Sequence, residues 1–377
     1  MTAVNLSTLL VTSLVSLLLG IVLVLTQRWH GQLTHDQTQG IQKFHTTPTP
    51  RVGGIPIFAA LLASQSWLVE PLQSQLSVLL LGALPAFAFG LAEDMTKRVS
   101  VLTRLLATIA SGMLACWLSG YSLSRLDIIG LDWALQWLPL SVLFTAFAVA
   151  GVANAINISD GLNGLASSSS VWAFIGMGLM AQGAGDAELA ALSLLLAAAV
   201  LGFFLVNWPL GKIFLGDGGA YFIGFSLAWL AVLLAERNPG ISPFAALLVC
   251  VFPITEVLFS IYRRKVRHYH PGQPDQLHFH SLVKRRYVTR WFAGFPKVWR
   301  NSIAGLLVGS MTLPAAVLAQ FVHASTTLSV TCVLLCMLGY VALYARMVRH
   351  RWCSPIAFLL RKPAAVLRGH SHSPVAD

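Results

Sequence analysis

Charged side chains are scarce in this sequence. Asp, Glu, Lys and Arg together make up 10% of the 377 residues, whereas they make up about a quarter of a typical soluble domain. The same chain is 56% hydrophobic and has a mean hydropathy of +0.71. This composition excludes a soluble globular protein and predicts an integral membrane protein.

Cysteine is also rare, and its placement excludes further classes. The five cysteines are odd in number and scattered, and no CxxC pattern occurs, so neither a disulfide framework nor a Cys-rich zinc site is expected.

The apolar stretches lack the period-two alternation of a transmembrane β-barrel. The first stretch lacks a basic leader and a small-residue cleavage pattern, so we expect a retained span and not a signal peptide.

Long apolar stretches are abundant. A helix needs about 20 apolar residues to cross roughly 30 Å of hydrocarbon. Eleven stretches are candidates: 4–26, 54–70, 76–92, 101–119, 134–152, 168–182, 187–206, 214–235, 242–262, 302–320 and 327–346. The sequence predicts an all-α integral membrane protein with about eleven transmembrane helices. We expect one membrane domain over 1–346 and a basic, partly disordered tail over 347–377.

Lys and Arg are distributed unevenly between the gaps. Of the 25 such residues, only Arg125 and Arg237 fall in gaps after even-numbered helices. Because cytoplasmic loops carry the excess of Lys and Arg, the N-terminus is predicted outside and the C-terminus in the cytoplasm. The cytoplasmic loops are then about 27–53, 93–100, 153–167, 207–219 and 263–301. The net charge of +11 suits the lipid bilayer surface, and no nucleic-acid recognition module is present, so no nucleic-acid partner is expected.

The second and fourth of these loops carry acidic residues next to apolar spans. Glu93 and Asp94 precede Lys97, and adjacent carboxylates flanked by cations suit Mg²⁺–phosphate chemistry. A solvated helix end is the alternative for this string. Asp217 lies between glycines and is predicted to be either a Mg²⁺ ligand or a cap of the helix that begins there.

The third loop holds the most specific string, Asn154-Ala155-Ile156-Asn157-Ile158-Ser159-Asp160-Gly161-Leu162-Asn163-Gly164-Leu165. Asn and Asp oxygens are hard ligands that suit Mg²⁺, and the glycines permit a tight turn around a bound group. A long apolar span seldom ends by chance in this combination. The string therefore predicts a ligand-binding loop.

The first and last loops carry cations. Lys43 and Arg51 lie in a Pro- and Gly-rich loop that either holds phosphate or is a stiff turn into the second helix. His278 and His280 suit a diphosphate site, with zinc as the alternative. Glu256 lies inside the ninth predicted helix, where a charge needs a partner, and is either structural or lines the cavity.

Taken in order, these strings resemble the polyprenyl-phosphate N-acetylhexosamine-1-phosphate transferases, especially the bacterial undecaprenyl-phosphate branch. The likeness covers about residues 40–290. It rests on 49–54, on 93–97 (similar to the DDxxK motif), on 154–165 (which matches NxxNxxDGxxGL), on 214–218 and on 274–280.

The resemblance implies transfer of a sugar phosphate from a UDP-linked N-acetylated sugar to polyprenyl phosphate, with release of UMP, at the bacterial cytoplasmic membrane. It implies Mg²⁺, with Mn²⁺ as the alternative, and leaves a homodimer open. Asp94 would be the acid nearest the acceptor phosphate, with Glu93 beside it. Asp217 and Asn157 would hold Mg²⁺, and Asp160 would shape the nucleotide site. Asn163 would face the uracil, and the other substrate contacts would come from Lys43, Arg51, Lys97, Asn207, His278 and His280.

Three positions depart from patterns in that family. Glu93 replaces the first Asp of DDxxK, so the role of that position is altered or dispensable. Ser281 replaces a further His found in many members, which shifts phosphate contact toward Lys284, Arg285 or Arg286. Asn163 replaces the Asp of members that use a muramyl-pentapeptide donor, so that donor is disfavoured. N-acetylglucosamine is the default sugar, with deoxy or diamino sugars as alternatives.

Other chemistries and protein classes make different demands on the sequence. Direct attack by the lipid phosphate is the expected mechanism, and a two-step route through an aspartyl-phosphate is its alternative. A transporter would place acids at the membrane midplane, and a membrane prenyltransferase would need two DDxxD-like clusters. Here every acid except Glu256 lies outside the predicted helices or at a helix end, and two DDxxD-like clusters do not occur.

Overall fold

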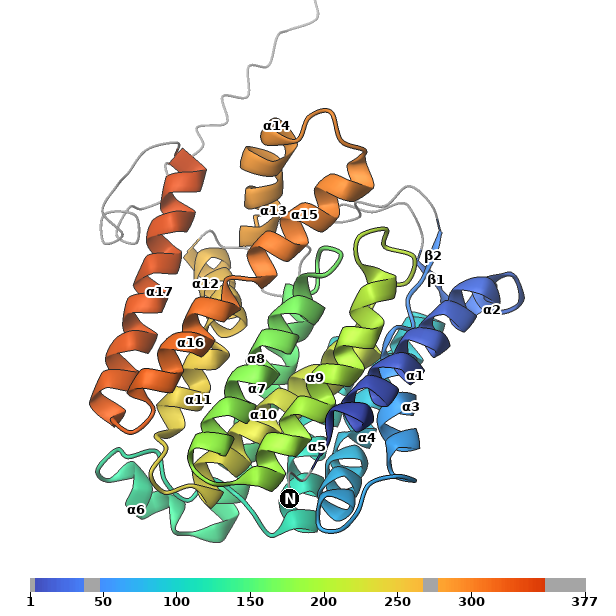
Figure 1. The fold of residues 1–377 in the computed structure, drawn as a ribbon. Coiled ribbons are helices and arrows are strands. Elements are labelled where there is room, and N and C mark those ends of the chain that lie inside the picture. Colours follow the sequence, from blue (N-terminus) through green and yellow to red (C-terminus); the bar gives the residue numbers. More distant parts are fainter. Residues whose placement is uncertain (1–3, 37–47, 267–276, 350–377) are drawn as a thin grey trace, which may run out of the picture.

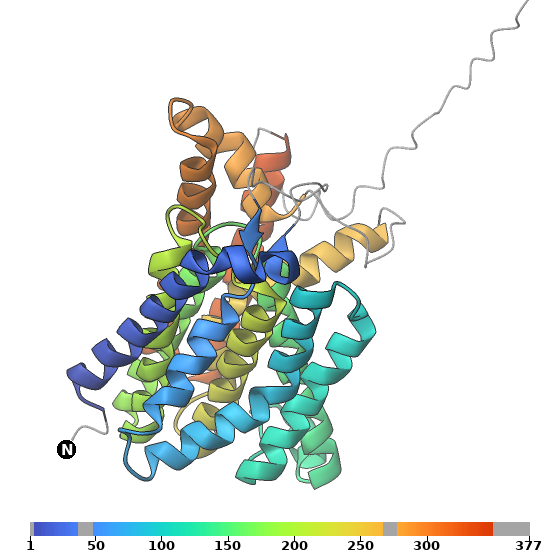
Figure 2. The same ribbon diagram turned by 90° about the vertical axis from the view of Figure 1, so that its right-hand side faces the viewer.

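The computed structural model describes residues 4–36, 48–266 and 277–349, which are almost entirely helical (Figures 1 and 2). The helices are α1 (Leu6–Leu25), α2 (Gln27–Thr34), α3 (Gly54–Ser64), α4 (Leu72–Thr96), α5 (Val101–Ser119), α6 (Leu131–Leu135), α7 (Leu138–Ser159), α8 (Leu165–Gly183), α9 (Ala187–Asn207), α10 (Gly216–Arg237), α11 (Pro243–Val249), α12 (Val251–Val266), α13 (Phe279–Val283), the π-helical turn η1 (Lys284–Val288), α14 (Thr289–Trp291), α15 (Lys297–Gly309), α16 (Thr312–Val322) and α17 (Thr326–Arg349). Two short antiparallel strands, β1 (His35–Asp36) and β2 (Thr49–Pro50), pair with each other.

Eight helical stretches of the described chain are long and apolar enough to cross a membrane. They are α1, α4, α5, α7, α9, α10, the stretch Lys297–Val322 formed by α15 and α16, and α17. The bent pair α11 and α12 gives a ninth if it counts as one span. The all-α membrane class is confirmed, but the count of eleven is not. The predicted stretch 54–70 forms the 11-residue α3, and 168–182 forms the serine-rich α8.

Helix α10 lies at the centre of the bundle. In the 18-residue apolar stretch of α10 that could cross the membrane, 94% of the residues are buried inside the protein, against 17% in the corresponding stretch of α1. α10 packs against α4 and α7, whereas much of α1 is free to face lipid. Because α10 begins with Gly216-Asp217-Gly218, its central position puts Asp217 in the middle of one end of the bundle.

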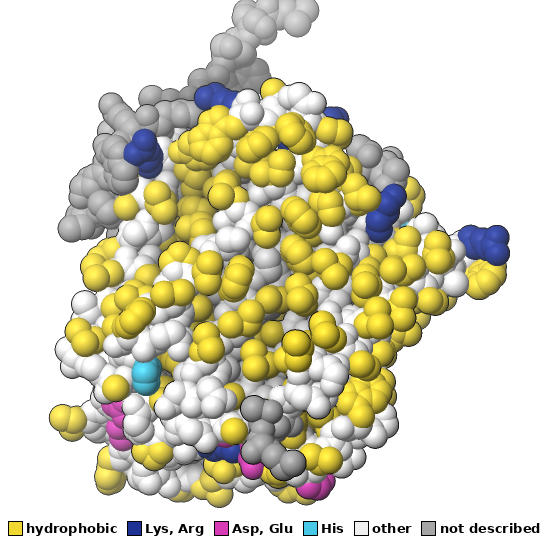
Figure 3. All heavy atoms as spheres, in the orientation of Figure 1, with side chains coloured by type: hydrophobic (Ala, Val, Ile, Leu, Met, Phe, Trp, Pro, Cys, Tyr) yellow, Lys and Arg dark blue, Asp and Glu magenta, His cyan; other side chains and the backbone are white. Residues whose placement is uncertain are grey.

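The polar elements gather at that same end. α13, α14 and the start of α15 project there, and α6 and the start of α1 lie at the opposite end (Figures 1 and 2). On the face shown in Figure 3, Lys and Arg lie mainly toward the α14 end, Asp and Glu lie near the other, and hydrophobic side chains cover the region between. This asymmetry agrees with the predicted distribution of charge, while the orientation across the membrane stays a prediction.

The predicted span 242–262 is a broken helix. α11 and α12 meet at Cys250 with a bend of 78°. Pro253, the third residue of α12, has no N–H to donate to the carbonyl four residues earlier, which favours a break at this point. The bend places Glu256, one turn further on, close to the segment at the polar end that carries His278 and His280, here called the histidine segment.

Candidate active site

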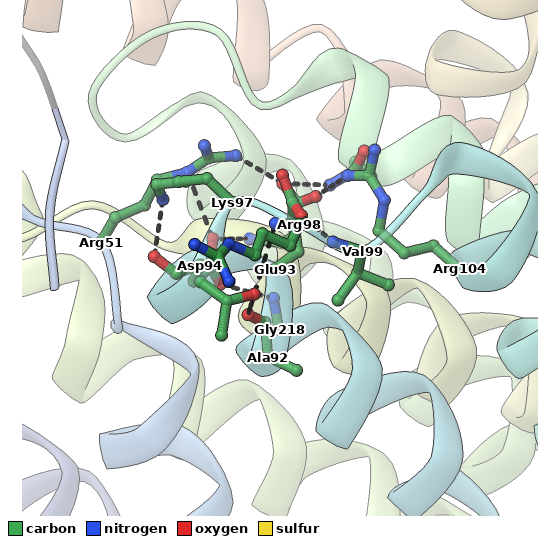
Figure 4. Close-up of polar contacts among 12 residues, drawn as sticks. Arg51, Ala92, Glu93, Asp94, Lys97, Arg98, Val99, Arg104 and Gly218 are labelled. Carbon is green, nitrogen blue, oxygen red and sulfur yellow. Dashed lines mark hydrogen bonds and ion pairs between the residues drawn. The ribbon is translucent and has the colours of Figure 1, made fainter. Parts of the chain in front are cut away.

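Asp217, the second residue of α10, is the centre of a charged cluster. Its side chain is 4% exposed. Oδ1 accepts hydrogen bonds from Arg51 Nη2 at 2.5 Å and from Asn157 Nδ2 at 3.1 Å. Oδ2 pairs with Arg104 of α5, which approaches from the side opposite to Arg51 (Figure 4). Segments far apart in the sequence thus meet at one carboxylate.

Asp94, near the C-terminal end of α4, caps α10. Its Oδ1 accepts from the backbone N–H of Asp217 at 2.9 Å, and its Oδ2 accepts from the N–H of Gly218 at 2.8 Å. A carboxylate at a helix N-terminus satisfies unpaired amides and interacts favourably with the helix dipole. The capping role that the sequence offered to Asp217 is therefore filled by Asp94, and the Asp217 side chain is directed at arginines.

The close approach of these loops requires glycine at position 216. Gly216 has a φ of +77°, and a Cβ there would lie 2.5 Å from both the Asp94 carboxylate and the carbonyl oxygen of Arg51. The backbone joins the same loops, because Phe214 N donates to Pro50 O at 2.8 Å. The first, second and fourth of the loops that were predicted to be cytoplasmic therefore lie together in the structure.

Glu93 and Lys97 are more accessible than Asp94, which is 0% exposed. Glu93 is half-buried, and its Oε2 accepts from Val99 N at 2.8 Å. Lys97 ends α4 with a left-handed φ of 57°, and its Nζ donates to the Asp94 carbonyl oxygen at 2.6 Å. A direct contact of Asp94 with the acceptor stays a prediction that would require its capping bonds to be exchanged. Glu93 can meet a substrate without that loss.

Asp160 follows α7 and lies beside the cluster. It is half-buried, and its carboxylate has no hydrogen-bond partner among the described residues. Burial raises the pKa of Asp160 to about 7; the positive charge of Arg51 opposes this rise and the negative charge of Asp217 adds to it. An acid pushed toward its neutral form in this way is typical of functional sites.

The histidine segment contacts the loop that carries Asp160, and so it belongs to the same site. The His280 ring lies against Gly161, in the space that a Cβ at that position would occupy. The rings of His278 and His280 stack with centroids 5.4 Å apart. His278 Nδ1 lies 2.8 Å from Glu256 Oε1, so Glu256 is a partner of the histidine segment. The third and fifth predicted loops therefore also converge.

Two predicted substrate residues, Asn207 and Asn163, are buried near the cluster and are hydrogen-bonded to other parts of the protein. Asn207 Oδ1 accepts from Gly164 N at 2.6 Å, and its Nδ2 donates to Ile213 O at 2.7 Å. Because both polar atoms are bonded to the backbone, Asn207 braces the loops, and its contact with substrate stays a prediction. Asn163 is buried and donates to Ser302 Oγ at 3.1 Å, so its contact with uracil stays a prediction. Lys43 lies outside the described residues.

The oxygen atoms of the cluster suit Mg²⁺ that is bound partly by the protein and partly by substrate and water. They are less suited to a metal ion held by protein side chains alone. Among the described residues, no three His, Cys, Asp or Glu side chains form a ready-made metal site. Mg²⁺ commonly uses one or two carboxylates and completes its shell with substrate phosphates and water. The Asp217 carboxylate, the Asn157 amide and the unbonded Asp160 carboxylate fit this pattern.

Two contributors were not predicted from the sequence. Arg104, the fourth residue of α5, forms an ion pair with Asp217. It is the one charged residue in the apolar stretch 101–119, and charged residues inside membrane spans are usually functional, so the sequence did contain a signal for it. Tyr340 of α17 donates to Glu256 Oε2 at 2.8 Å. A tyrosine in an apolar span gives no comparable signal.

The cluster lies largely within a region shared with known proteins. Residues 76–235 match the model of glycosyl transferase family 4. The chain is 29% identical over 290 residues to the undecaprenyl-phosphate alpha-N-acetylglucosaminyl 1-phosphate transferase of Escherichia coli (strain K12), which covers 75% of this chain and 76% of that protein. It is 31% identical over 249 residues to the protein of the same name from Salmonella typhimurium, covering 65% and 67%. A probable undecaprenyl-phosphate N-acetylglucosaminyl 1-phosphate transferase of Bacillus subtilis is 29% identical over 247 residues, covering 64% and 67%.

Proposed function

The chain belongs to glycosyl transferase family 4, and we propose that it transfers an N-acetylated hexosamine 1-phosphate from a UDP-sugar to undecaprenyl phosphate, which begins a lipid-linked glycan. An oxygen of the lipid phosphate attacks the sugar-proximal phosphorus of the donor. A P–O bond forms there, and the bond from that phosphorus to the bridging oxygen breaks, so that UMP leaves. The observation that carries the proposal is the meeting of two arginines and an amide at Asp217, in a chain related to the transferases named above.

Charge neutralisation is the main demand of this reaction, because both substrates are anions. Arg51 is the accessible cation of the cluster: its side chain is 31% exposed, with Nε 3.3 Å from Asp94 and Nη2 2.5 Å from Asp217. The two acids fix the guanidinium in place. A preorganised donor of this kind contributes about 3–4 kcal/mol to a charged transition state. Arg51 and the exposed Lys97 are the proposed phosphate ligands.

Mg²⁺ is the proposed cofactor, held by Asp217 and Asn157 with Asp160 beside them. When bound, it would neutralise phosphate oxygens and make the phosphorus more electrophilic. Arg104 keeps the Asp217 carboxylate oriented from the α5 side. Mn²⁺ is the proposed substitute.

Orientation and deprotonation of the acceptor phosphate are assigned to the acids at the end of α4. Glu93 keeps accessible surface, and Asp94 holds the start of α10. We therefore place Glu93 nearer to the acceptor and give Asp94 the task of fixing Asp217. Direct attack remains preferred over an aspartyl-phosphate, since the most central acids are already bonded to cations or backbone amides.

An apolar cavity offers space for the acceptor chain. It has a volume of about 260 Å³ and is lined only by apolar residues of α7, α10, α11 and the loop after α5, including Phe144, Val152 and Leu247. α7 and α10 carry Asn157 and Asp217 at their polar ends. Ala228, in the cavity wall, is eleven residues beyond Asp217, or about 16 Å along the helix. A polyprenyl chain spans that distance easily, so we assign its tail to this cavity.

The protein is a multi-pass membrane protein. We propose that it resides in the bacterial cytoplasmic (inner) membrane with the Asp217 end in the cytoplasm, where UDP-sugars are available. The sugar is proposed to be N-acetylglucosamine, from the names of the relatives.

The proposal is tested by incubating membranes that contain the chain with polyprenyl phosphate and a panel of sugar-labelled UDP-N-acetyl donors. We expect label in lipid and an equal amount of UMP, and no such product from membranes without the chain. No turnover with any donor of the panel would remove the assignment. Initial rates at varied concentrations of both substrates test the mechanism, because parallel double-reciprocal lines would contradict direct attack.

A further inference from the structure

We propose that Glu256 of α12 and Tyr340 of α17 are positioning residues that hold His278 and His280, the predicted ligands of the donor diphosphate, against the Gly161 turn. The α17 helix then influences the reactivity of the site at which the donor diphosphate binds. The inference rests on the proposed function. It adds residues that lie outside the matched region 76–235.

The Glu256 carboxylate is fully occupied by donors. Oε1 contacts His278 Nδ1 at 2.8 Å, Oε2 accepts from the Tyr340 hydroxyl at 2.8 Å, and both oxygens lie 3.2 Å from Phe279 N. Glu256 is 1% exposed. A buried carboxylate in a membrane span is costly unless it is paired, and an apolar residue would pack there at lower cost. The arrangement therefore points to a role for the charge itself.

The contacts also select one form of the His278 ring. A carboxylate only accepts hydrogen bonds, so Nδ1 of His278 must carry a proton. Nε2, on the far side of the ring, is then the atom directed away from Glu256. A carboxylate that fixes the tautomer and ring plane of a working histidine is a recurrent device in catalytic sites.

The backbone before His278 is held by a second pair from the same two helices. Arg263 Nη1 donates to Leu277 O at 2.6 Å, and the Tyr344 hydroxyl donates to the same oxygen at 3.0 Å. Arg263 and Tyr344 also bond to each other. Together with the Glu256 bond to Phe279 N, these contacts fix the chain on both sides of His278.

The position of His278 is passed on to the site through its neighbour. The Phe279 ring packs against Tyr340 with centroids 5.0 Å apart, and the His278 and His280 rings on either side of it stack on each other. Their planes lie within 4° of each other, and His280 rests on Gly161. That turn adjoins Asp160 and the end of α7 that carries Asn157. A shift at Glu256 therefore moves both imidazoles relative to the Asp217 cluster.

The test is a double-mutant cycle on the purified full-length chain, with kcat and both KM values measured for UDP-N-acetylglucosamine and undecaprenyl phosphate. Glu256→Gln should lower kcat by about 10- to 100-fold, as for other residues that orient a working imidazole. Tyr340→Phe should lower kcat by about three- to tenfold, because one of several donors is lost. KM for the lipid acceptor should stay within about twofold, since the histidines act on the donor side.

A comparison of Glu256→Gln in the wild-type chain and in a His278→Ala chain separates a positioning role from a general effect on stability. In a His278→Ala chain, Glu256→Gln should cause little further loss, because the residue through which it acts is gone. An equal fold-loss in both backgrounds would overturn the inference. So would a wild-type kcat for His278→Ala, or for both single variants.

Two controls make the result readable. Tyr121→Phe removes a hydroxyl from a 39% exposed tyrosine that lies after α5, and it should leave kcat and thermal unfolding unchanged. If Glu256→Gln does not fold, Tyr340→Phe keeps the ring packing and carries the same cycle. Wild-type turnover in the same assay tests the proposed function separately, since its absence would refute the transferase and leave the variants without a reaction to affect.

Discussion

Replacement of Asp217 by asparagine is expected to remove turnover and to weaken the fold by a limited amount. Three donors point at this carboxylate: Arg51, Arg104 and Asn157. In Asp217→Asn one of them would face an NH₂ group, and two guanidinium groups would lose their main counter-charge. Removal of one partner from a buried ion pair costs about 3–5 kcal/mol.

The expected loss of stability lies at or below the lower limit of that range. The Arg51 and Arg104 side chains are 31% and 16% exposed, so water can hydrate both after the change. Arg51 also keeps its contact with Asp94. We expect a loss of about 2–3 kcal/mol in the free energy of unfolding, and a loss of at least about 10²-fold in kcat because a group that organises phosphate charge is gone.

The assay combines initial rates over a Mg²⁺ series with thermal unfolding of the purified protein in detergent. The matched control is the double variant Asp217→Asn with Arg104→Gln, in which one stranded cation is also removed. Its destabilisation should be smaller than the sum of the two single changes, because the residues are in contact. Strict additivity together with wild-type kcat in Asp217→Asn would refute the reasoning.

Four further outcomes are expected. For Asp160, the pKa is raised from its ordinary value of 3.8 to about 7, so the folded protein binds more protons than the unfolded chain between these values and stability falls as pH rises from about 4 to 7; Asp160→Asn should flatten this slope in thermal unfolding, and an unchanged slope contradicts the assignment. Gly216→Ala should lower both stability and activity, because its φ is +77° and its Cβ would meet the Asp94 carboxylate, whereas Gly151→Ala, in open space on α7, should be neutral in both assays. Glu93→Gln should lower kcat with little change in stability, but Asp94→Asn should lower both because it uncaps α10; equal unfolding temperatures for the two variants would argue against the cap. Asn207→Ala should cost about 2–5 kcal/mol, since it leaves two buried backbone groups unpaired, and a stability loss below 1 kcal/mol in denaturant or thermal unfolding would show that the brace is dispensable.

The positions of the spans could be predicted because hydropathy is a local property. All eleven predicted stretches are helical, although 54–70 contains only the short α3. Composition does not report a bend, however, so 242–262 was predicted as one span. Pro253 near the break was its available signal.

The composition of the site was predictable, and its internal pairing was not. Asp217, Asn157 and Arg51 could be chosen because Asn, Asp and Gly strings at the ends of apolar spans are unusual. Their contacts depend on how helices pack, which is why the capping bonds of Asp94 and the backbone bonds of Asn207 could not be read from the sequence. Glu256 and Tyr340 are 84 residues apart, and no local pattern connects them.

The most direct measurement follows the two halves of the donor at once. The purified chain, Mg²⁺ and undecaprenyl phosphate are incubated with UDP-N-acetylglucosamine that carries ³²P in the sugar-proximal phosphate and ¹⁴C in the sugar. The account predicts that both labels enter lipid in equal amounts, with unlabelled UMP as the soluble product. Sugar label in lipid without ³²P, accompanied by UDP, would contradict it, and so would the absence of both labels from lipid.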